Sequence, residues 1–471
     1  MPSPFQGIDT MSTALRAFQR QLDVTGHNIA NINTPGYSRQ TVSLSAAEPT
    51  TFTEGGLITL GNGVRVDSVN RVRDMFLEGR QQTANSDIGQ ASAQNTALQQ
   101  VESIVQEPST NGISSALGKF FDAWSGLASN AGQVGQTTQV QLAGQTLADR
   151  IRGTYASLKD LNTQQQGLAT QTLKDIQTSV NNIADLNQAI RQKQSEGGQP
   201  NDLMDKRDQA IQELSGLAGI QTQKFSDGSI GVSMNQLTLV DSSGAKTIPT
   251  NFNATTNTIS NASGSYSVGG GKLKGIFDSI NSISSYQTRL DTLANNLRAQ
   301  VNSLHATGIN AAGATGLKFF NDVISGPQTG AIDFNLDTVG VVGPPASVGV
   351  GVNAQAIASG VSGSAGDGGL ASSISTLQNQ SQVSLGNLSE TDYYSSLVGD
   401  IGRDKKFAAT TLDTKSALAD QITNQVQSNS GVSLDDEMAN MLRFQRSYQA
   451  AAKALSTFDS VMGELIDMLK R

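Results

Sequence analysis

Both ends of the chain carry apolar residues at alternating spacings of three and four, the pattern of a coiled-coil seam. The N-terminal seam consists of Ile8, Met11, Leu15, Phe18, Leu22, Ile29 and Ile32, with Thr25 as a single polar member. A helix with such a stripe is stable only when another element covers it. The pattern therefore predicts a long N-terminal helix that requires a helical partner and ends before Pro35, near Thr34.

The C-terminal segment shows a similar alternation when it is counted from Leu434. The counted positions are Leu434, Met438, Met441, Gln445, Tyr448, Ala452, Leu455, Asp459, Met462, Ile466 and Leu469, and Leu442 is assigned to the same surface. Ser433 and Asp436 have the spacing of a helix cap. The two terminal helices would be about 45 and 54 Å long. We expect them to pack against each other and to offer their remaining surface to neighbouring copies; two amphipathic helices of an ordinary helical core are the alternative.

The middle of the chain predicts a rod-like helical body with inserted strands. Apolar residues recur at helical spacing in residues 73–107, 137–195, 201–219 and 273–306, and helix resumes within 370–428. Residues 220–271 alternate apolar and polar side chains between turn pairs, which indicates short strands. The predicted fold class is therefore mainly α with a small β region.

These patterns divide the chain into four parts. Residues 1–40 plus 430–471 are expected to form a terminal coiled-coil domain. Residues 41–219, 272–320 and 370–429 are expected to form the helical body, and 220–271 the small β region. The Gly-rich residues 321–369 are interpreted as short strands and loops.

Composition argues against several classes of partner and chemistry. Only 15% of the residues are charged, the net charge is −8, and Lys and Arg are not clustered, so nucleic acid and membrane are not expected partners. The chain has no cysteine and only two histidines, His27 and His305, which leaves little for metal or thiol chemistry. The first residues lack the pattern of a cleaved leader peptide, which suits either the cytoplasm or leaderless export.

Catalytic motifs are weak. The glycines of 349–354 resemble a dinucleotide fingerprint, but no long helix follows them. The acids at 435–437 are explained by helix capping, and His305 is interpreted as a capping or partly buried histidine. We therefore predict no enzymatic activity, no cofactor and no metal. An enzyme or secreted adhesin that uses residues 330–369 is kept as the alternative from another class.

The segment from Leu15 to Gln40 resembles the N-terminal signature of the bacterial flagellar axial protein family, which includes rod, hook and hook-associated proteins. It contains Asn28, Asn31, Asn33, Thr34, Pro35, Gly36 and Tyr37, followed by Ser38-Arg39-Gln40. This ending is typical of the hook-associated members, whereas hook and distal rod proteins, the nearer alternative, usually continue with Lys. Four further stretches agree with this branch in matching order: 61–77, 203–208, 302–320 and 431–450.

The resemblance implies an extracellular structural subunit that joins the flagellar hook to the filament. It implies export through the flagellar type III apparatus without signal cleavage, and polymerisation through the terminal helices. The implied partners are other copies of the chain, the hook protein, a second junction protein and an export chaperone that holds the C-terminal seam. Longer members carry an outer β domain after the Phe319-Phe320 motif, and here we expect it to be absent or vestigial.

The asparagines of this signature have a physical interpretation. Asn28 and Asn31 lie three residues apart on one helical face, and amides that cross a helix interface fix its register by hydrogen bonding. With Pro35 and Gly36 at its centre, a type II turn would place Tyr37 against the base of the helix.

Overall fold

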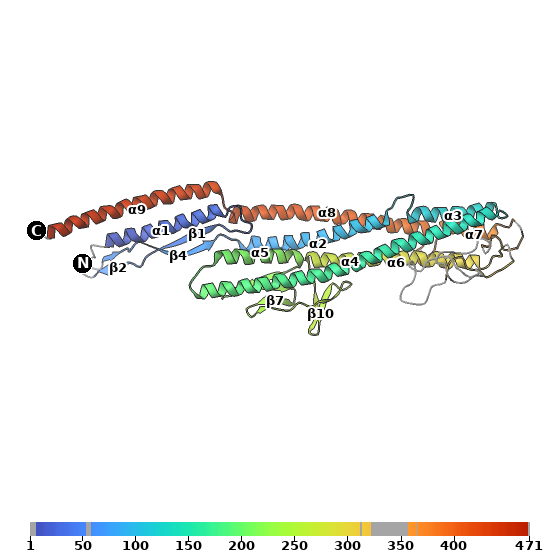
Figure 1. The fold of residues 1–471 in the computed structure, drawn as a ribbon, viewed down its shortest axis with the longest axis horizontal. Coiled ribbons are helices and arrows are strands. Elements are labelled where there is room, and N and C mark those ends of the chain that lie inside the picture. The colour runs from blue at the N-terminus through green and yellow to red at the C-terminus, as the bar shows by residue number, and fades with distance from the viewer. Residues whose placement is uncertain (1–5, 53–57, 311–312, 322–356, 365, 470–471) are drawn as a thin grey trace, which may run out of the picture.

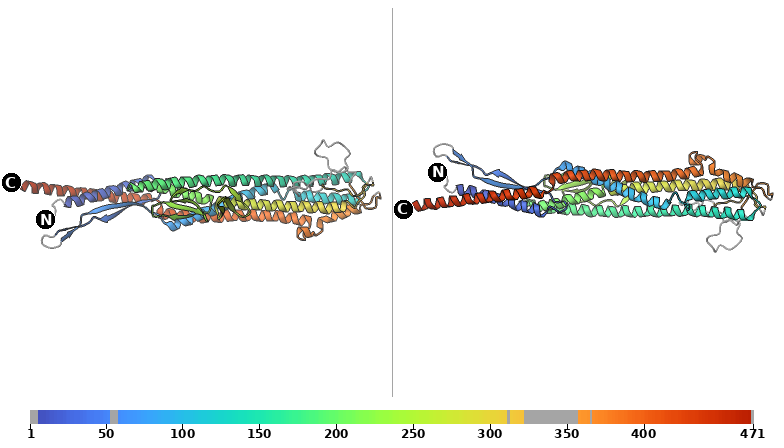
Figure 2. Two further views of the ribbon diagram at one scale, coloured as in Figure 1. Left: turned by 90° about the horizontal axis from the view of Figure 1, so that it is seen from below. Right: turned by 90° about the horizontal axis from the view of Figure 1, so that it is seen from above.

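The structure is a computed structural model that describes residues 6–52, 58–310, 313–321, 357–364 and 366–469. The molecule is a long rod in which most helices run along the same axis, and the described chain begins and ends at the same end of that rod (Figure 1). Two further views show the same slender outline (Figure 2). The rod consists of a terminal domain and a helical trunk.

The terminal domain is built on α1 (Gln6–Ala30) and α9 (Leu434–Leu469), which pack side by side. Asn28 bonds to Glu437 near one end of the pair, and a Cβ added at Gly7 would lie 2.9 Å from the ring of Phe458 near the other. The two helices are therefore antiparallel, and α9 continues about a dozen residues beyond the level of Gly7 (Figure 1). This arrangement confirms the predicted packing of one chain end against the other.

A long β-hairpin completes this domain and corrects the prediction that residues 41–71 belong to the helical body. Strands β1 (Gln40–Ala46) and β4 (Val64–Arg71) pair antiparallel and pack along α1. Strands β2 (Thr50–Phe52) and β3 (Ile58–Leu60) pair further out. Val42 and Leu44 in β1, and Val64 and Val66 in β4, are two residues apart, which suits a pleated strand covered on one face. The hairpin therefore extends the terminal domain rather than the trunk.

The trunk is a bundle of long helices. It contains α2 (Met75–Val105), α3 (Ile113–Ser129), α4 (Val134–Ser195), α5 (Asn201–Leu217), α6 (Gly271–His305), α7 (Gly369–Thr376) and α8 (Glu390–Ser430). Two short 3-10 turns, Leu377–Asn379 and Val383–Leu385, precede α8. The core at the far end centres on Trp124, whose ring lies edge-on to Phe120 and Phe319. This bundle confirms the predicted helical body.

Two small antiparallel sheets lie against the trunk and confirm the strands expected within 220–271. The first has the order β5 (Gln221–Lys224), β6 (Ile230–Met234), β7 (Leu237–Asp241) and β8 (Gly244–Ala245). The second has β10 (Thr258–Asn261) between β9 (Asn251–Asn253) and β11 (Gly264–Ser267). Their inner side chains share one apolar core with α4, α5 and α6, so the strands cover one side of the helices.

Residues 322–356 lie outside the described part of the chain. The expectations for the Gly-rich segment 321–369, for the glycines of 349–354 and for an outer domain fall wholly or mostly on them. Among the described helices, none is both long and apolar enough to cross a bilayer.

Candidate assembly site

Asn28 is the residue that connects most parts of the terminal domain. It lies in the last turns of α1 and is only 1% exposed. Its Nδ2 donates to the backbone oxygen of Gln40 at 2.9 Å and to Oε2 of Glu437 at 3.2 Å. Its Oδ1 accepts from the hydroxyl of Tyr37 at 2.7 Å and from the backbone N–H of Gln40 at 2.9 Å. One amide therefore joins α1, the turn after it, β1 and α9, with all of its hydrogen-bonding positions in use.

Asn31 and Asn33 do not share this role. Helix α1 ends at Ala30, four residues before the predicted end, so both residues lie in the turn that follows. The amide of Asn31 donates to the backbone oxygen of His27 at 3.0 Å and accepts from the Thr34 hydroxyl at 3.1 Å. These contacts cap the helix end locally, and Asn33 is exposed. The expectation that Asn31 crosses the helix interface beside Asn28 is wrong, because the chain leaves the helix before Asn31 can project from it.

The turn itself has the predicted geometry. The backbone N–H of Tyr37 donates to the oxygen of Thr34 at 3.2 Å, and Gly36 has a φ of +76°, which a side chain at this position would oppose. Tyr37 folds back onto α1, where its ring centroid lies 5.5 Å from that of His27. Burial, with the nearby Asp202, Asp205 and Glu437, raises the pKa of Tyr37 well above its usual range. Its hydroxyl therefore stays protonated and donates to Asn28.

A buried ionic network, which we call the joint network, ties this turn to the trunk. It consists of Ser38, Arg71, Arg73, Asp205 and Asp208, from the turn, the end of β4 and α5. Arg71 Nη1 lies 2.7 Å from Asp205 and 2.8 Å from Asp208, and Arg73 Nη1 lies 2.7 Å from Asp208. Ser38 donates to Asp205 from its hydroxyl at 2.8 Å and from its backbone at 3.2 Å. Asp205 thus receives donors from two separate segments, and Asp208 receives both arginines from the end of β4.

Arg71 keeps its positive charge in the joint network. Burial lowers the pKa of Arg71, but Asp208 and Asp205 outweigh burial and the net shift is upward. Desolvation of such groups offsets most of their mutual attraction, so a buried network adds little net stability. Breaking it by removing one partner is costly, however, because a buried charge is then left without compensation. The network therefore fixes the direction in which the terminal domain leaves the trunk.

The joint network continues into the small sheets. Arg207, between the two carboxylates on α5, is 3% exposed and donates to the backbone oxygen of Gly228 at 2.9 Å. Asn187 of α4 receives a further bond from Arg207 at 3.3 Å and pairs with the backbone of Ile230 in both directions. The β region, the trunk and the base of the terminal domain therefore share one continuous set of polar contacts.

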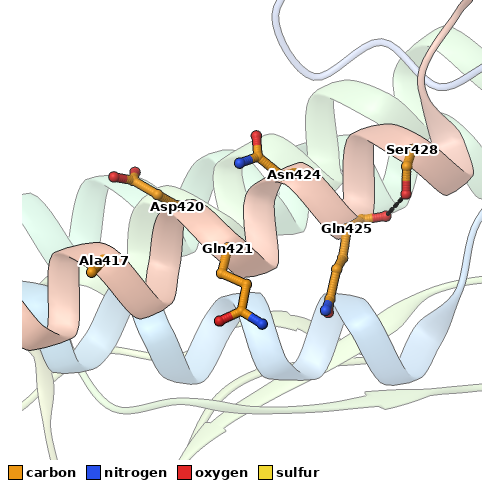
Figure 3. Close-up of a pocket in the computed structure, with 6 residues that line it drawn as sticks. All are labelled: Ala417, Asp420, Gln421, Asn424, Gln425 and Ser428. Atoms are coloured by element: carbon orange, nitrogen blue, oxygen red, sulfur yellow. Dashed lines mark hydrogen bonds between the residues drawn. The ribbon is translucent and has the colours of Figure 1, made fainter.

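The signature turn also forms one wall of a groove at this joint. The groove has a volume of about 760 Å³, and residues 31–38 face residues from α2, α5 and the end of α8 across it. A second depression, on the outer face of α8, is lined by six short or polar residues of that single helix, Ala417, Asp420, Gln421, Asn424, Gln425 and Ser428 (Figure 3). Its only titratable group is Asp420, so it offers no pair of groups for acid–base chemistry.

The predicted N-terminal seam is half covered in this single chain. Its members Ile8, Met11, Leu15, Phe18, Leu22 and Ile29 are all partly exposed, and Ile32, beyond the end of α1, is 37% exposed. The deepest residues of α1 are instead Ala17, Val24, Thr25 and Asn28. The small side chains allow close approach of the neighbouring elements, while the larger seam residues keep part of their apolar surface free.

The predicted C-terminal register is wrong in part. Glu437 contacts Asn28 of α1, and Phe458 lies against Gly7 of α1. A three–four alternation between them and beyond places Met441, Phe444, Tyr448, Ala451, Leu455 and Met462 on the same side, although Tyr448 and Phe458 remain 37% and 44% exposed. Every second position of this alternation was predicted. Met441, Tyr448, Leu455 and Met462 thus belong to both registers. Leu434, Met438, Leu442 and Ile466 are 45%, 51%, 55% and 45% exposed. Leu434 is seven residues before Met441 and shares its position in the repeat, whereas Met438, Leu442 and Ile466 lie on another face. The side chain of Leu469 is outside the described structure.

The predicted register differs from the observed one because α9 carries two apolar stripes. The observed stripe replaces Gln445 and Asp459 with Phe444 and Phe458, so it buries more apolar surface against α1. Glu437, expected only to favour the helix start, is 3% exposed because Asn28 satisfies it. The predicted cap is present, since the Ser433 hydroxyl accepts from the backbone of Asp436 at 3.4 Å.

Residues 203–208 and 69–77 were recognised in the sequence only as stretches of family resemblance. The structure shows why they matter, because they supply the aspartates and arginines of the joint network. The signal available was the unusual density of charge in a chain that is only 15% charged. Among the described residues, no three His, Asp or Glu side chains are grouped so that they could hold a metal ion.

Comparison with known proteins agrees with this architecture. A family model described as the helical domain of the flagellar hook-associated protein FlgK matches residues 98–320. Models for the flagella basal body rod protein and for the C-terminal region of the flagellar basal body rod proteins FlgEFG match residues 8–37 and 423–468. The ends therefore resemble those of axial proteins in general, and the trunk resembles that of the hook-associated branch.

Full-length relatives belong to the same branch. Flagellar hook-associated protein 1 of Bacillus subtilis is 27% identical, and the alignment covers 99% of both chains. The Escherichia coli protein of the same name is 26% identical over 98% of this chain and 99% of its own. The flagellar hook junction protein FlgK from Burkholderia pseudomallei has a similar fold, with a TM-score of 0.61 and 18% identity over 75% of this chain and all of that one. The chain is therefore similar to flagellar hook-associated protein 1 over nearly its whole length, and its trunk matches the helical domain of that protein.

Proposed function

We propose that this chain is a structural subunit that joins the flagellar hook to the filament and assembles through its terminal helices. The observation that carries the proposal is the uncovered apolar surface of the terminal domain. Leu434, Met438 and Leu442 are each about half exposed, and the α1 seam is only half buried. Apolar stripes on helices of this length favour association with further copies.

The joint network favours a structural subunit over an enzyme. Its one hydroxyl, that of Ser38, donates to Asp205 but is only 4% exposed, and Arg71 holds the same carboxylate oxygen. Its geometry holds the terminal domain at a defined angle to the trunk. A repeated subunit needs such an angle, because small errors accumulate around a ring.

We further propose that the chain leaves the cell through the flagellar type III apparatus without signal cleavage. A dedicated export chaperone would cover the C-terminal helix before assembly, and the hook protein and a second junction protein would contact the subunit afterwards. The methionines of α9 suit two successive partners, since flexible thioether side chains adapt to different surfaces.

Electron microscopy of a deletion strain tests the junction role. We expect hooks that lack filaments, and filaments restored by the wild-type gene. Normal filaments on the deletion strain would overturn the proposal, and missing hooks would favour a hook or distal rod protein.

Secretion assays test the export route with two truncations. A chain that ends at Gly431 should lose chaperone binding but still be exported, whereas deletion of residues 3–36 should leave chaperone binding intact and stop export. The opposite pattern would contradict the proposed division between the two ends.

A further inference from the structure

Phe407 of α8 is a large apolar side chain that is 73% exposed on the outside of the trunk. Leu142 and Val383 are similarly exposed, so exposure alone does not single out Phe407. Helix α8 packs mainly against α2, whereas α4 packs against α3, α5 and α6, and the two helices run along opposite flanks of the trunk (Figure 2). What distinguishes Phe407 is the surface that α4 presents at the same level of the rod.

The level of Phe407 follows from polar contacts that cross the trunk through α6 and α2. Through α6 these are Tyr286–Asp404 at 2.7 Å and Asn162–Ser284 at 2.9 Å, and through α2 they are Lys405–Glu102 at 3.2 Å and Gln165–Gln100 at 3.5 Å. Helices α4 and α8 both run toward the joint (Figure 1). Because each residue advances a helix by about 1.5 Å, both routes place Phe407 level with residues 163–165 of α4.

At that level α4 offers a hole for an aromatic ring. Asp160, Thr163, Gln164 and Gly167 are all exposed, and they have the spacing of the four residues that surround a knob when helices interlock. A Cβ added at Gly167 would meet nothing within 4 Å, so packing within the single chain does not require a glycine there. Glycine inside a helix costs about 1 kcal/mol relative to alanine. The missing side chain leaves room for a ring that comes from outside.

Charges beside the hole complement those beside Phe407. Lys406 and Asp413 are exposed on α8, and Asp160 and Lys174 are exposed on α4. None of these four has an ion pair with another described residue. Side chains on a helix tilt toward its N-terminus. When two copies lie parallel at one level, Lys406 therefore leans toward Asp160, and Lys174 leans toward Asp413.

We propose that α8 of one copy packs against α4 of the next copy at the same level, with Phe407 in the hole beside Gly167 and both charge pairs formed. The occupant is a second copy because it brings the complementary flank in parallel orientation, whereas a chain's own α4 lies across its trunk from Phe407. Two different surfaces on opposite flanks repeat around a ring without a step along the rod. The inference rests on the proposed function as an assembling subunit, and it adds a contact outside the terminal domain.

Charge reversal in flagellated cells tests one of the pairs. Lys406→Glu and Asp160→Lys should each lower the amount of the chain in purified hooks about fivefold, because like charges would then face each other beside Phe407. The double variant should return to within about twofold of wild type. Asp185→Lys is the control, since Asp185 is exposed on the same helix about 35 Å nearer the joint, and it should not rescue Lys406→Glu. A double variant that stays as low as the single ones would overturn the lateral contact.

Cysteine cross-linking gives an independent readout, since the natural chain has no cysteine. Phe407→Cys combined with Gly167→Cys should form dimers and longer ladders in purified hooks on mild oxidation. Gly153→Cys replaces Gly167→Cys in the control pair, because Gly153 is equally open but about 21 Å further from the joint, and this pair should form none. If the wild-type chain is absent from hooks, the proposed junction role fails. If it is present and the test pair gives no more dimer than the control pair, the lateral contact alone is wrong.

Discussion

Replacing Asn28 by Ala tests whether one amide holds the terminal domain together. The substitution removes partners from four groups: both backbone groups of Gln40, the hydroxyl of Tyr37 and the carboxylate of Glu437. Leaving a buried polar group unsatisfied costs about 1–3 kcal/mol, and partial rehydration reduces the sum. We therefore expect a loss of about 3–5 kcal/mol in the local stability of the α1–α9 pair.

Amide hydrogen exchange on the full chain measures this loss, since it reports each segment separately. A change of 3 kcal/mol corresponds to roughly 100-fold faster exchange in α1 and α9. The single tryptophan, Trp124, is fully buried in the trunk, so its fluorescence should give the same unfolding midpoint in variant and wild type.

Asn31→Ala is the matched control, with the same residue type in the same motif. Its contacts are local and exposed, so we expect a change within about 0.5 kcal/mol. Equal effects of the two substitutions, or protection of α1 that does not change in the Asn28 variant, would refute the reasoning.

The trunk and the helix faces give three further tests. Phe120→Ala removes a fully buried ring and should destabilise the trunk by about 3–5 kcal/mol in calorimetry, without faster exchange in α1. Burial raises the pKa of Glu390 to about 7, with the Asn296 hydrogen bond opposing it, so the folded pKa lies above the unfolded value of 4.5. Stability should therefore fall as pH rises from about 4.5 to 7, and urea midpoints of Glu390→Gln at pH 5 and 7.5 should differ less than those of wild type. Leu455→Asp, on the stripe that meets α1, should speed exchange in both terminal helices, whereas Leu442→Asp, which is 55% exposed, should leave exchange unchanged and reduce incorporation into hooks.

The sequence predicted the terminal helices because their apolar spacing is a local signal. It did not predict which stripe of α9 meets α1, since Met438, Leu442 and Ile466 are as apolar as Phe444, Ala451 and Phe458. Only the shape of the partner decides between two such stripes. The hairpin of residues 40–71 was missed because its few apolar residues are separated by many polar and charged ones, which makes the alternation weak.

The joint network could not be derived from sequence because its members are far apart in the chain. Ser38 and Asp205 are 167 positions apart, and nothing local in either segment indicates that they meet. The environment of His305 could not be derived from the sequence for the same reason. It was expected at a capping or partly buried position, yet it is fully buried: Nδ1 lies 2.8 Å from the oxygen of Leu317, and Nε2 accepts from Ala358 at 3.1 Å.

The contact between Asn28 and Glu437 joins residues 409 positions apart, which has a consequence for timing. Any process that delivers the chain from its N-terminus releases α1 first and α9 last. During this interval most of the trunk can fold through its own contacts. The most buried residues of α1 remain uncovered until α9 is present. The surface proposed to recognise other copies is therefore completed only after the final helix has emerged. A chain that lacks α9 would have no complete terminal domain through which to assemble.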